Sequence, residues 1–171
     1  MLIIRELEPN DDFNAVGHIY AESWKASYRG IVPQAYLDKL NHNRWSAMLR
    51  ADPAQSLGAF LDGTLVGTAM VSFARDAERE GYGEIVSIYL LPAYTGRGYG
   101  KELMQACLEK LSQDGCADIC LWVIEQNQQA KSFYQRMGFH STGRTQAESF
   151  GGKELQLMEF CMHRADDHSA L

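Results

Sequence analysis

Residue types that mark specialised protein classes are scarce in this chain of 171 residues. There are four cysteines, Cys107, Cys116, Cys120 and Cys161, and none forms a Cys-x-x-Cys pair. This spacing gives no sign of a disulfide framework or zinc finger and predicts buried, idle thiols. The five histidines also lack metal-ligand spacing, so we expect no metal.

A basic excess and long hydrophobic runs are also missing. The net charge is -6, whereas nucleic-acid binding normally shows as a surplus of Lys and Arg. No segment approaches the roughly 20 apolar residues of a membrane span, and the start lacks the pattern of a signal peptide. We therefore expect a cytoplasmic protein without nucleic-acid or membrane partners, and the acidic balance weakly favours cationic ligands.

The remaining composition is that of an ordinary folded protein, with 46% hydrophobic and 22% charged residues. The length suits one domain with a real core and is short for two. No internal repeat or linker is visible. We expect a single domain over residues 1–163 and a frayed polar tail over 164–171.

Hydrophobic periodicity predicts strands and helices along the whole domain. Strands are expected at 2–7, 57–61, 65–73, 84–91 and 119–124, and as a pair within 139–162. Helices are expected at 13–28 and in two short pieces between 33 and 50. Two more are expected, one from the glycines at 96–100 to Gly115 and one over 130–137, which Gly138 ends. The strand at 84–91 is apolar almost throughout, which predicts burial on both faces. The strand, helix, strand order that follows it predicts a crossover unit.

A glycine-rich loop, residues 96–100, lies between that apolar strand and the next helix. Unpaired backbone N–H groups and the positive helix end favour a phosphate there. A dinucleotide fingerprint would need glycine at Lys101 or Leu103, and a Walker A loop would need glycine at Thr95 and a hydroxyl at Glu102. Both are excluded by spacing, and a tight turn without ligand remains the alternative.

A second segment, residues 127–139, reads Asn-Gln-Gln-Ala-Lys-Ser-Phe-Tyr-Gln-Arg-Met-Gly-Phe. With the loop at 95–100 it resembles the GNAT superfamily of N-acetyltransferases, whose members carry Gln/Arg-x-x-Gly-x-Gly/Ala and then Asn-x-x-Ala-x-x-Phe-Tyr-x-x-x-Gly-Phe. Thr95 departs from this pattern, so one pyrophosphate contact of the family would be either lost or replaced by the Thr95 hydroxyl and Arg97. The resemblance implies an α+β (mixed α/β) domain, in which helices flank a mixed, mostly antiparallel sheet of six to seven strands.

The resemblance also implies a site for acetyl-CoA as co-substrate. Main-chain groups around Ile88 would bind the pantetheine arm, and a bulge there would free an oxyanion donor. The residues implied for the cofactor are Ile88, Tyr89, Leu90, Thr95, Gly96, Arg97, Gly98, Tyr99, Gly100, Lys101, Asn127, Ala130, Phe133 and Tyr134. Helix N-capping by Asn127 and core packing of Phe133 are alternative roles.

Attack of an amine on a thioester needs a base, an oxyanion donor and an acid. Glu84, at the head of its strand, is the predicted base; Glu80 and Glu125 are substitutes, and simple surface exposure is the alternative. The resemblance implies Tyr134 as the acid, because in the family this hydroxyl lies near the sulfur, where a phenol can protonate the departing thiolate. Its alternative is a core tyrosine.

The acyl acceptor is the least determined part of the reaction. Trp24 and Tyr28 lie one helical turn apart in the first helix region, which in the family often forms one wall of the acceptor pocket. The resemblance thus implies that they contact the acceptor, with core packing as the alternative. The acceptor is expected to be a primary amine of a small molecule or peptide. A non-catalytic coenzyme A binding module, and an enzyme for another acyl donor admitted by Ser87 and Tyr89, remain open. A homodimer is common in the family, and the C-terminal strands are expected to be able to supply its interface.

Overall fold

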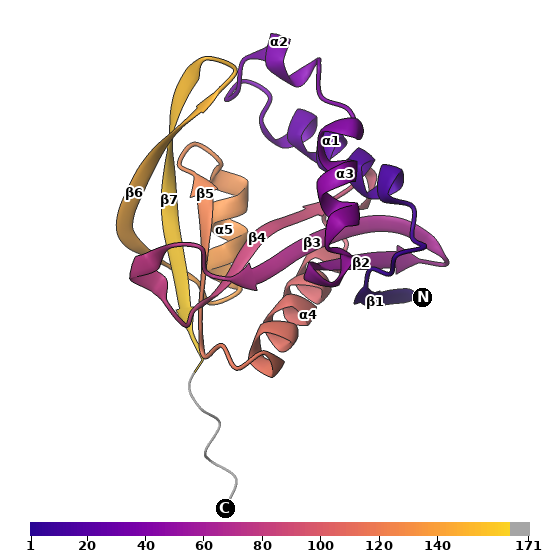
Figure 1. Ribbon diagram of the computed structural model, residues 1–171. Helices are drawn as coiled ribbons and strands as arrows, with labels where there is room; N and C mark the ends of the chain where they lie inside the picture. The colour runs from indigo at the N-terminus through magenta and orange to yellow at the C-terminus, as the bar shows by residue number, and fades with distance from the viewer. Residues whose placement is uncertain (165–171) are drawn as a thin grey trace, which may run out of the picture.

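In the computed structural model, which describes residues 1–164, seven strands form one sheet and five α-helices cover its two faces (Figure 1). The strands are β1 (Leu2–Glu6), β2 (Ser56–Leu61), β3 (Thr64–Phe73), β4 (Gly83–Leu90), β5 (Asp118–Ile124), β6 (His140–Phe150) and β7 (Lys153–His163). The helices are α1 (Phe13–Ser27), α2 (Gln34–Leu37), α3 (Asn43–Ala51), α4 (Tyr99–Gln113) and α5 (Gln128–Arg136). The single-turn helices η2 (Ala77–Arg79) and η3 (Pro92–Tyr94) flank β4.

The strand order is β1-β2-β3-β4-β5-β7-β6, and only β4 and β5 are parallel neighbours. Parallel neighbours need a crossover, which α4 supplies. The predicted α+β fold, its mostly antiparallel sheet and its crossover unit are therefore confirmed.

Each face of the sheet has its own hydrophobic core. On one face α4 buries the predicted stripe of Leu103, Met104, Cys107, Leu108 and Leu111. On the other face α1, α2 and α3 pack through a second cluster against the end of β5, the end of β6 and the start of β7. The sheet is thus the middle of three layers, with α1 and α3 above it and α4 below it in Figure 1. Helix α5, drawn beside β5, packs against the same core as α4.

Local signals in the sequence account for the boundaries of several elements. The Asp12 carboxylate accepts the N–H groups of Asn14 and Ala15 and so starts α1. The turn between β2 and β3 places both Asp62 (φ 48°) and Gly63 (φ 83°) in the left-handed region, which matches the twist of a two-residue hairpin.

The burial predicted for β4 is wrong over most of its length. Only its first residues, Gly83–Ile85, are buried, whereas residues 86–90 are half-buried. The cause is that β4 loses its neighbour β5 after Glu84, so one edge and part of both faces adjoin an opening. The apolar residues of β4 therefore belong partly to the core and partly to the lining of this opening.

Two further expectations concern the chain end and the thiols. Arg164, expected in the tail, donates to the carbonyls of Leu108 and Ala117; the rest of that tail lies outside the described residues. The four cysteines are free and buried, as predicted. Burial raises the pKa of Cys107 to about 12, which keeps this thiol protonated.

Over the described range, no helix has both the length and the apolarity to cross a membrane.

Candidate active site

The sheet opens between its two parallel strands. β4 and β5 pair only at Gly83 with Ile119 and at Glu84 with Cys120, and then separate. Opposite β3 the register of β4 shifts by one residue, which leaves Val86 as the extra residue of a bulge. A bulge bends the strand and frees backbone groups. The bulge was expected around Ile88, and the structure places it two positions earlier.

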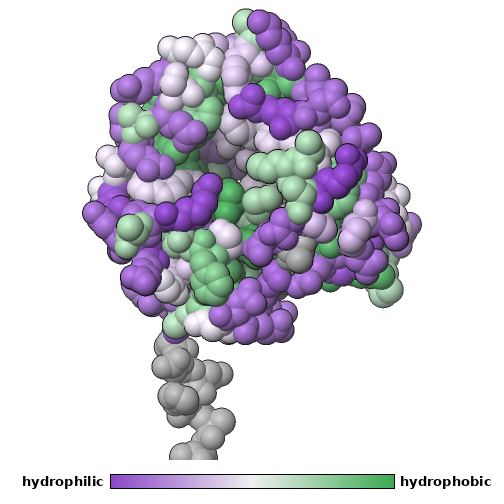
Figure 2. All heavy atoms as spheres, in the orientation of Figure 1, coloured by the Kyte–Doolittle hydropathy of each residue, from purple (hydrophilic) through white to green (hydrophobic). Residues whose placement is uncertain are grey.

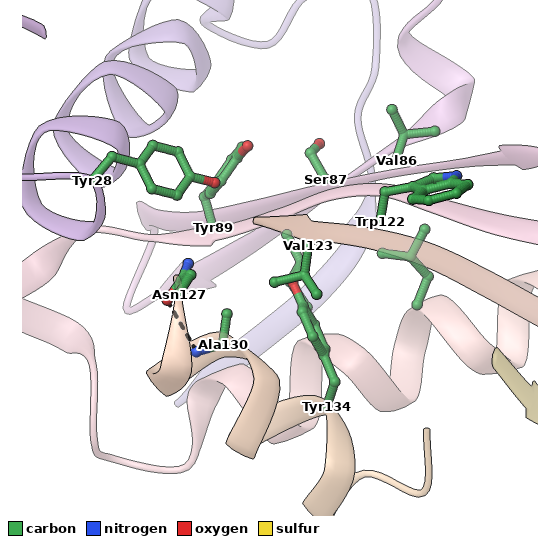
Figure 3. Close-up of a pocket in the computed structure, with 11 residues that line it drawn as sticks. Tyr28, Val86, Ser87, Tyr89, Trp122, Val123, Asn127, Ala130 and Tyr134 are labelled. Carbon is green, nitrogen blue, oxygen red and sulfur yellow. Dashed lines mark hydrogen bonds between the residues drawn. The ribbon is translucent and has the colours of Figure 1, made fainter. Parts of the chain in front are cut away.

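A cavity of about 50 Å³ fills this opening. Figure 3 shows that residues from both faces of the sheet meet there: Tyr28, Ser87 and Trp122 on the α1 side, and Ala130 and Tyr134 on the α5 side. The opening therefore connects the two faces, so that two ligands approaching from opposite sides can meet within the sheet.

The glycine loop leaves the start of α4 without a capping side chain. Gly98, in the left-handed region (φ 87°), is the N-cap residue, and the helix begins at Tyr99. A helix start without a cap presents its first N–H groups to a ligand. A methyl group added at Gly100 would lie 3.6 Å from a Leu90 carbon and 3.7 Å from the Phe133 ring, which are ordinary contacts. Packing therefore does not require glycine at position 100, whereas close approach of a phosphate to the backbone would favour it.

Thr95 and Arg97 differ in what they leave available to a phosphate. The Thr95 hydroxyl donates its single proton to the Pro92 carbonyl at 2.9 Å, so it is not free to donate to a phosphate oxygen. The exposed Arg97 guanidinium lies over the Tyr94 ring at 5.6 Å. Of the two side chains predicted to replace the family contact, Arg97 is the one with donors available.

Asn127 caps α5 and also lines the opening. Its side-chain oxygen accepts the Ala130 N–H at 3.2 Å, so the N-capping role is confirmed. The amide NH₂ group of the same side chain remains to donate into the cavity. Phe133 is half-buried against the core next to α4, so its packing role is also present.

Tyr134 extends from α5 toward the opening with its hydroxyl leading (Figure 3). Burial raises the pKa of Tyr134 above its ordinary value of 10.0. The phenol therefore stays protonated at neutral pH, as a proton donor must.

Glu84 lies at the closed end of the opening and is 4% exposed. Its carboxylate accepts three hydrogen bonds from Arg75: from the side chain at 2.8 and 3.1 Å, and from the backbone N–H at 3.2 Å. A carboxylate has about four lone-pair sites, so about one remains, and it is on Oε1 because Oε2 accepts two of the three bonds. Glu80 and Glu125, the predicted substitutes, are exposed.

Polar side chains of α1 are bonded to β4 along the opening. Ser23 donates to the Leu90 carbonyl at 2.7 Å, and Tyr20 shares a hydrogen bond of 2.7 Å with Ser87. The Trp24 indole N–H donates to the Tyr89 hydroxyl at 3.1 Å. These bonds fix the side of β4 that faces α1.

The two predicted acceptor residues occupy different places. Trp24 packs edge-on against Tyr28 at 4.8 Å and lies 5.6 Å from Phe150, so its alternative role in the core is realised. Tyr28 lines the opening, where its phenol lies beside that of Tyr89. Burial raises the pKa of Tyr28 well above its ordinary range.

Sequence reasoning missed Tyr20, Ser23 and Arg75. Tyr20 and Ser23 lie on the buried face of α1, within one helical turn before Trp24. Polar groups on a buried helix face could have indicated that these two residues have hydrogen-bond partners there. Arg75 follows β3 in a loop, where nothing in the sequence indicates its partner.

A second cavity, of about 520 Å³, lies on the α1 side of the sheet. Trp122 lines both cavities, and Glu84 and Arg75 lie in the wall of the larger one. The face drawn in Figure 2 is hollowed between the β6–β7 hairpin and the helical layer. The remaining lining residues are Ala74, Asp76, Cys120, Arg144, Gln146 and Glu148.

Comparisons with known proteins agree with this geometry. The model of the Acetyltransferase (GNAT) family matches residues 14–139. The chain is 30% identical to the uncharacterized N-acetyltransferase YuaI of Bacillus subtilis over 93% of its own length and 90% of that protein. It is 28% identical to a spermidine N(1)-acetyltransferase of Thermoplasma acidophilum, over 75% of this chain and 83% of that one.

A solved structure, the PaiA N-acetyltransferase of Thermoplasma acidophilum in complex with coenzyme A, superimposes with a TM-score of 0.68 and 25% identity. The superposition covers 93% of this chain and 98% of that one. The chain therefore belongs to the GNAT acetyltransferase family and is an acetyl-CoA dependent N-acetyltransferase.

Proposed function

We propose that this enzyme acetylates a primary amine of a small molecule, with the donor on the α4–α5 side of the sheet and the acceptor on the α1 side. The observation that carries the proposal is the opening between β4 and β5. An uncapped helix start lies on one side of it, and a cavity containing a carboxylate lies on the other. Each ligand would then have a separate entrance to the reacting atoms.

The donor site would use mainly backbone groups. The first N–H groups of α4 would bind the pyrophosphate, and Arg97 would add a charged contact. The free edge of β4 from Val86 to Leu90 would bind the pantetheine amides in the manner of a strand, with Asn127 and Ala130 on the facing side. Lys101 is exposed in the first turn of α4.

The acid and base would act at opposite ends of the opening. Glu84 would take a proton from the acceptor ammonium through a water on Oε1, and the freed nitrogen would attack the thioester carbon. A backbone N–H freed by the bulge at Val86 would stabilise the oxyanion. As the carbon–sulfur bond breaks, the Tyr134 hydroxyl would give its proton to the thiolate. The nitrogen would release its second proton to solvent as the amide forms, and Tyr134 would regain a proton from solvent.

A panel of small amines tested with acetyl-CoA, with release of free thiol as the readout, examines this proposal directly. We expect thiol release that depends on both amine and enzyme. Calorimetric titration with coenzyme A should be run in parallel. Binding of coenzyme A without thiol release from any amine would contradict the proposal.

We expect the substitution Gly100→Ala to weaken coenzyme A binding at least about tenfold without loss of stability. The added methyl fits among the neighbouring protein atoms, and alanine favours the helix by about 1 kcal/mol over glycine. It would stand where a phosphate approaches the backbone. Calorimetry gives the affinity and thermal melting gives the stability.

The matched control is Ser112→Ala, because it raises helix propensity at the far, exposed end of α4. This variant should keep the affinity of the original enzyme. An unchanged affinity in Gly100→Ala would show that the phosphate does not lie against this turn.

We expect Tyr134→Phe to lower kcat about tenfold while leaving coenzyme A affinity within twofold. General acids contribute about 10²-fold or more. The loss should be smaller here, because a thiol with a pKa of about 8.5 forms a fairly stable thiolate, which leaves with less help from an acid. The raised pKa of Tyr134 implies that kcat of the original enzyme does not fall through this group until above pH 10. A pH profile of kcat for both forms is the measurement. Equal kcat in both forms at every pH would remove Tyr134 from the acid role.

The cytoplasmic location and the homodimer stay predictions. β6 forms one edge of the sheet and is exposed over nearly all its length, so it is the strand through which we propose that two copies pair. Light scattering of the purified protein measures the mass, and a monomer at micromolar concentration would contradict the pairing.

A further inference from the structure

The β6–β7 hairpin reaches the helical layer on the acceptor side. Its tip touches α2, where Gly151 packs directly against Tyr36. Lys153 donates to the Ile31 carbonyl at 3.0 Å, and Phe150 belongs to the core under α1. Figure 1 shows the tip meeting the chain next to α2. The acceptor side is therefore closed by protein at this end.

A second connection closes the opposite end. Arg144 of β6 donates to Asp76 at 2.6 Å, in the loop before η2, and to Glu159 of β7 at 2.8 Å. Arg79 of η2 binds the same Glu159. The cavity thus lies between two places where β6 and β7 are tied to other elements, which suits a slender molecule better than the surface of a folded protein.

The charges that line this cavity do not balance. Asp76, Glu84 and Glu148 face two guanidinium groups, those of Arg75 and Arg144. Arg75 is paired with Glu84, and Arg144 is already shared among Asp76, Glu78 and Glu159. Among the ion pairs of residues 1–164, none includes Glu148. The charge of Glu148 contributes to raising the pKa of Arg75, but Glu148 forms no ion pair of its own within these residues. This carboxylate in the cavity wall is therefore left to pair with a ligand.

We infer that the acceptor is a slender primary amine with a second cationic group, and that Glu148 selects it by pairing with that second group. The inference rests on the proposed function, because it assumes that the reacting amine occupies the opening beside Glu84. Glu148 is a specificity residue in this scheme and takes no part in the chemistry.

The test compares three acceptors with the same four-carbon chain and one reacting amine. Their far ends carry an ammonium group (diaminobutane), a methyl group (butylamine) or a carboxylate (4-aminobutanoate). We expect kcat/KM to fall in that order, by about tenfold at the first step, since a hydrogen bond to a charged group is worth about 1.5 kcal/mol or more. In Glu148→Gln the kcat/KM for the diamine should fall to near that for butylamine, and the kcat/KM for butylamine itself should stay unchanged.

Glu148→Lys should reverse the order and favour the carboxylate, which a merely structural role of Glu148 would not produce. Glu154→Gln, an exposed charge outside the cavity on the neighbouring β7, is the control and should preserve the original order. Preference of the original enzyme for butylamine or 4-aminobutanoate would overturn the inference, as would an equal loss for all three acceptors in Glu148→Gln. Acetylation of other amines but none of these three would overturn it and leave the proposed function standing.

Discussion

The substitution Glu84→Gln is expected to lower kcat at least about 100-fold while leaving the affinity for coenzyme A unchanged, because a general base contributes about 10²-fold to 10⁴-fold. Glutamine keeps the shape of the side chain and can accept from Arg75 through its one oxygen, but it cannot take the proton of an ammonium group. Steady-state kinetics with a saturating amine, together with calorimetry for coenzyme A, measure both quantities.

Arg75→Gln is the informative companion, because Glu84 is held by Arg75 and a structural role of the pair has to be separated from catalysis. Arg75 is 67% exposed, so its loss removes a hydrogen-bonded partner without exposing a core. We expect kcat to fall less than tenfold in this variant. If Glu84→Gln and Arg75→Gln lowered kcat equally and melted at the same lower temperature, Glu84 would be a structural partner of Arg75 and the base would have to be another group.

A second large effect is expected for stability. Glu159→Gln should lower the free energy of unfolding by about 3 kcal/mol, the usual scale for removing one partner of a buried ion pair. Glu159 is 0% exposed and accepts from Arg79, Thr142 and Arg144. These bonds join η2, β6 and β7 beside the larger cavity. Urea denaturation near neutral pH measures the change.

The pH dependence of this effect follows from the sign of the pKa shift. Burial by itself would raise the pKa of Glu159, but the hydrogen bonds from Arg79 and Thr142 and the charges of Arg79 and Arg144 outweigh it and lower the pKa below 4.5. A lowered pKa in the folded state stabilises the fold fully above pH 4.5. The advantage of the original protein over Glu159→Gln should therefore shrink as the pH falls below 4.5 and through the lowered value.

The control is again Glu154→Gln, an exposed carboxylate on the same strand, for which we expect a change within about 0.5 kcal/mol. A difference between the original protein and Glu159→Gln that stayed constant from neutral pH to well below 4.5 would show that the ionised carboxylate is not the source of the stability.

The class of fold and the course of the glycine loop were predictable because their signals are local. The apolar stripe of α4, the Asp12 cap of α1 and the Asp62-Gly63 turn each act within a few residues. The glycines at 96–100 specify a backbone path by their lack of side chains, and that path follows from sequence alone. The N-capping role of Asn127 is local in the same way.

The ion pairs and hydrogen bonds that join segments far apart in the sequence were decided only by the tertiary structure. Glu84 meets Arg75 across the β3–β4 connection, and Arg144 meets Asp76 across 68 positions of the chain. No periodicity encodes such pairs, since they depend on how strands are ordered in the sheet. The half-exposed state of β4 has the same origin, because whether an apolar residue is covered depends on where the neighbouring strand separates from it. The sequence thus determined the glycine loop and the order of elements, whereas the folded sheet alone determined the opening between β4 and β5 and the charges that line the larger cavity.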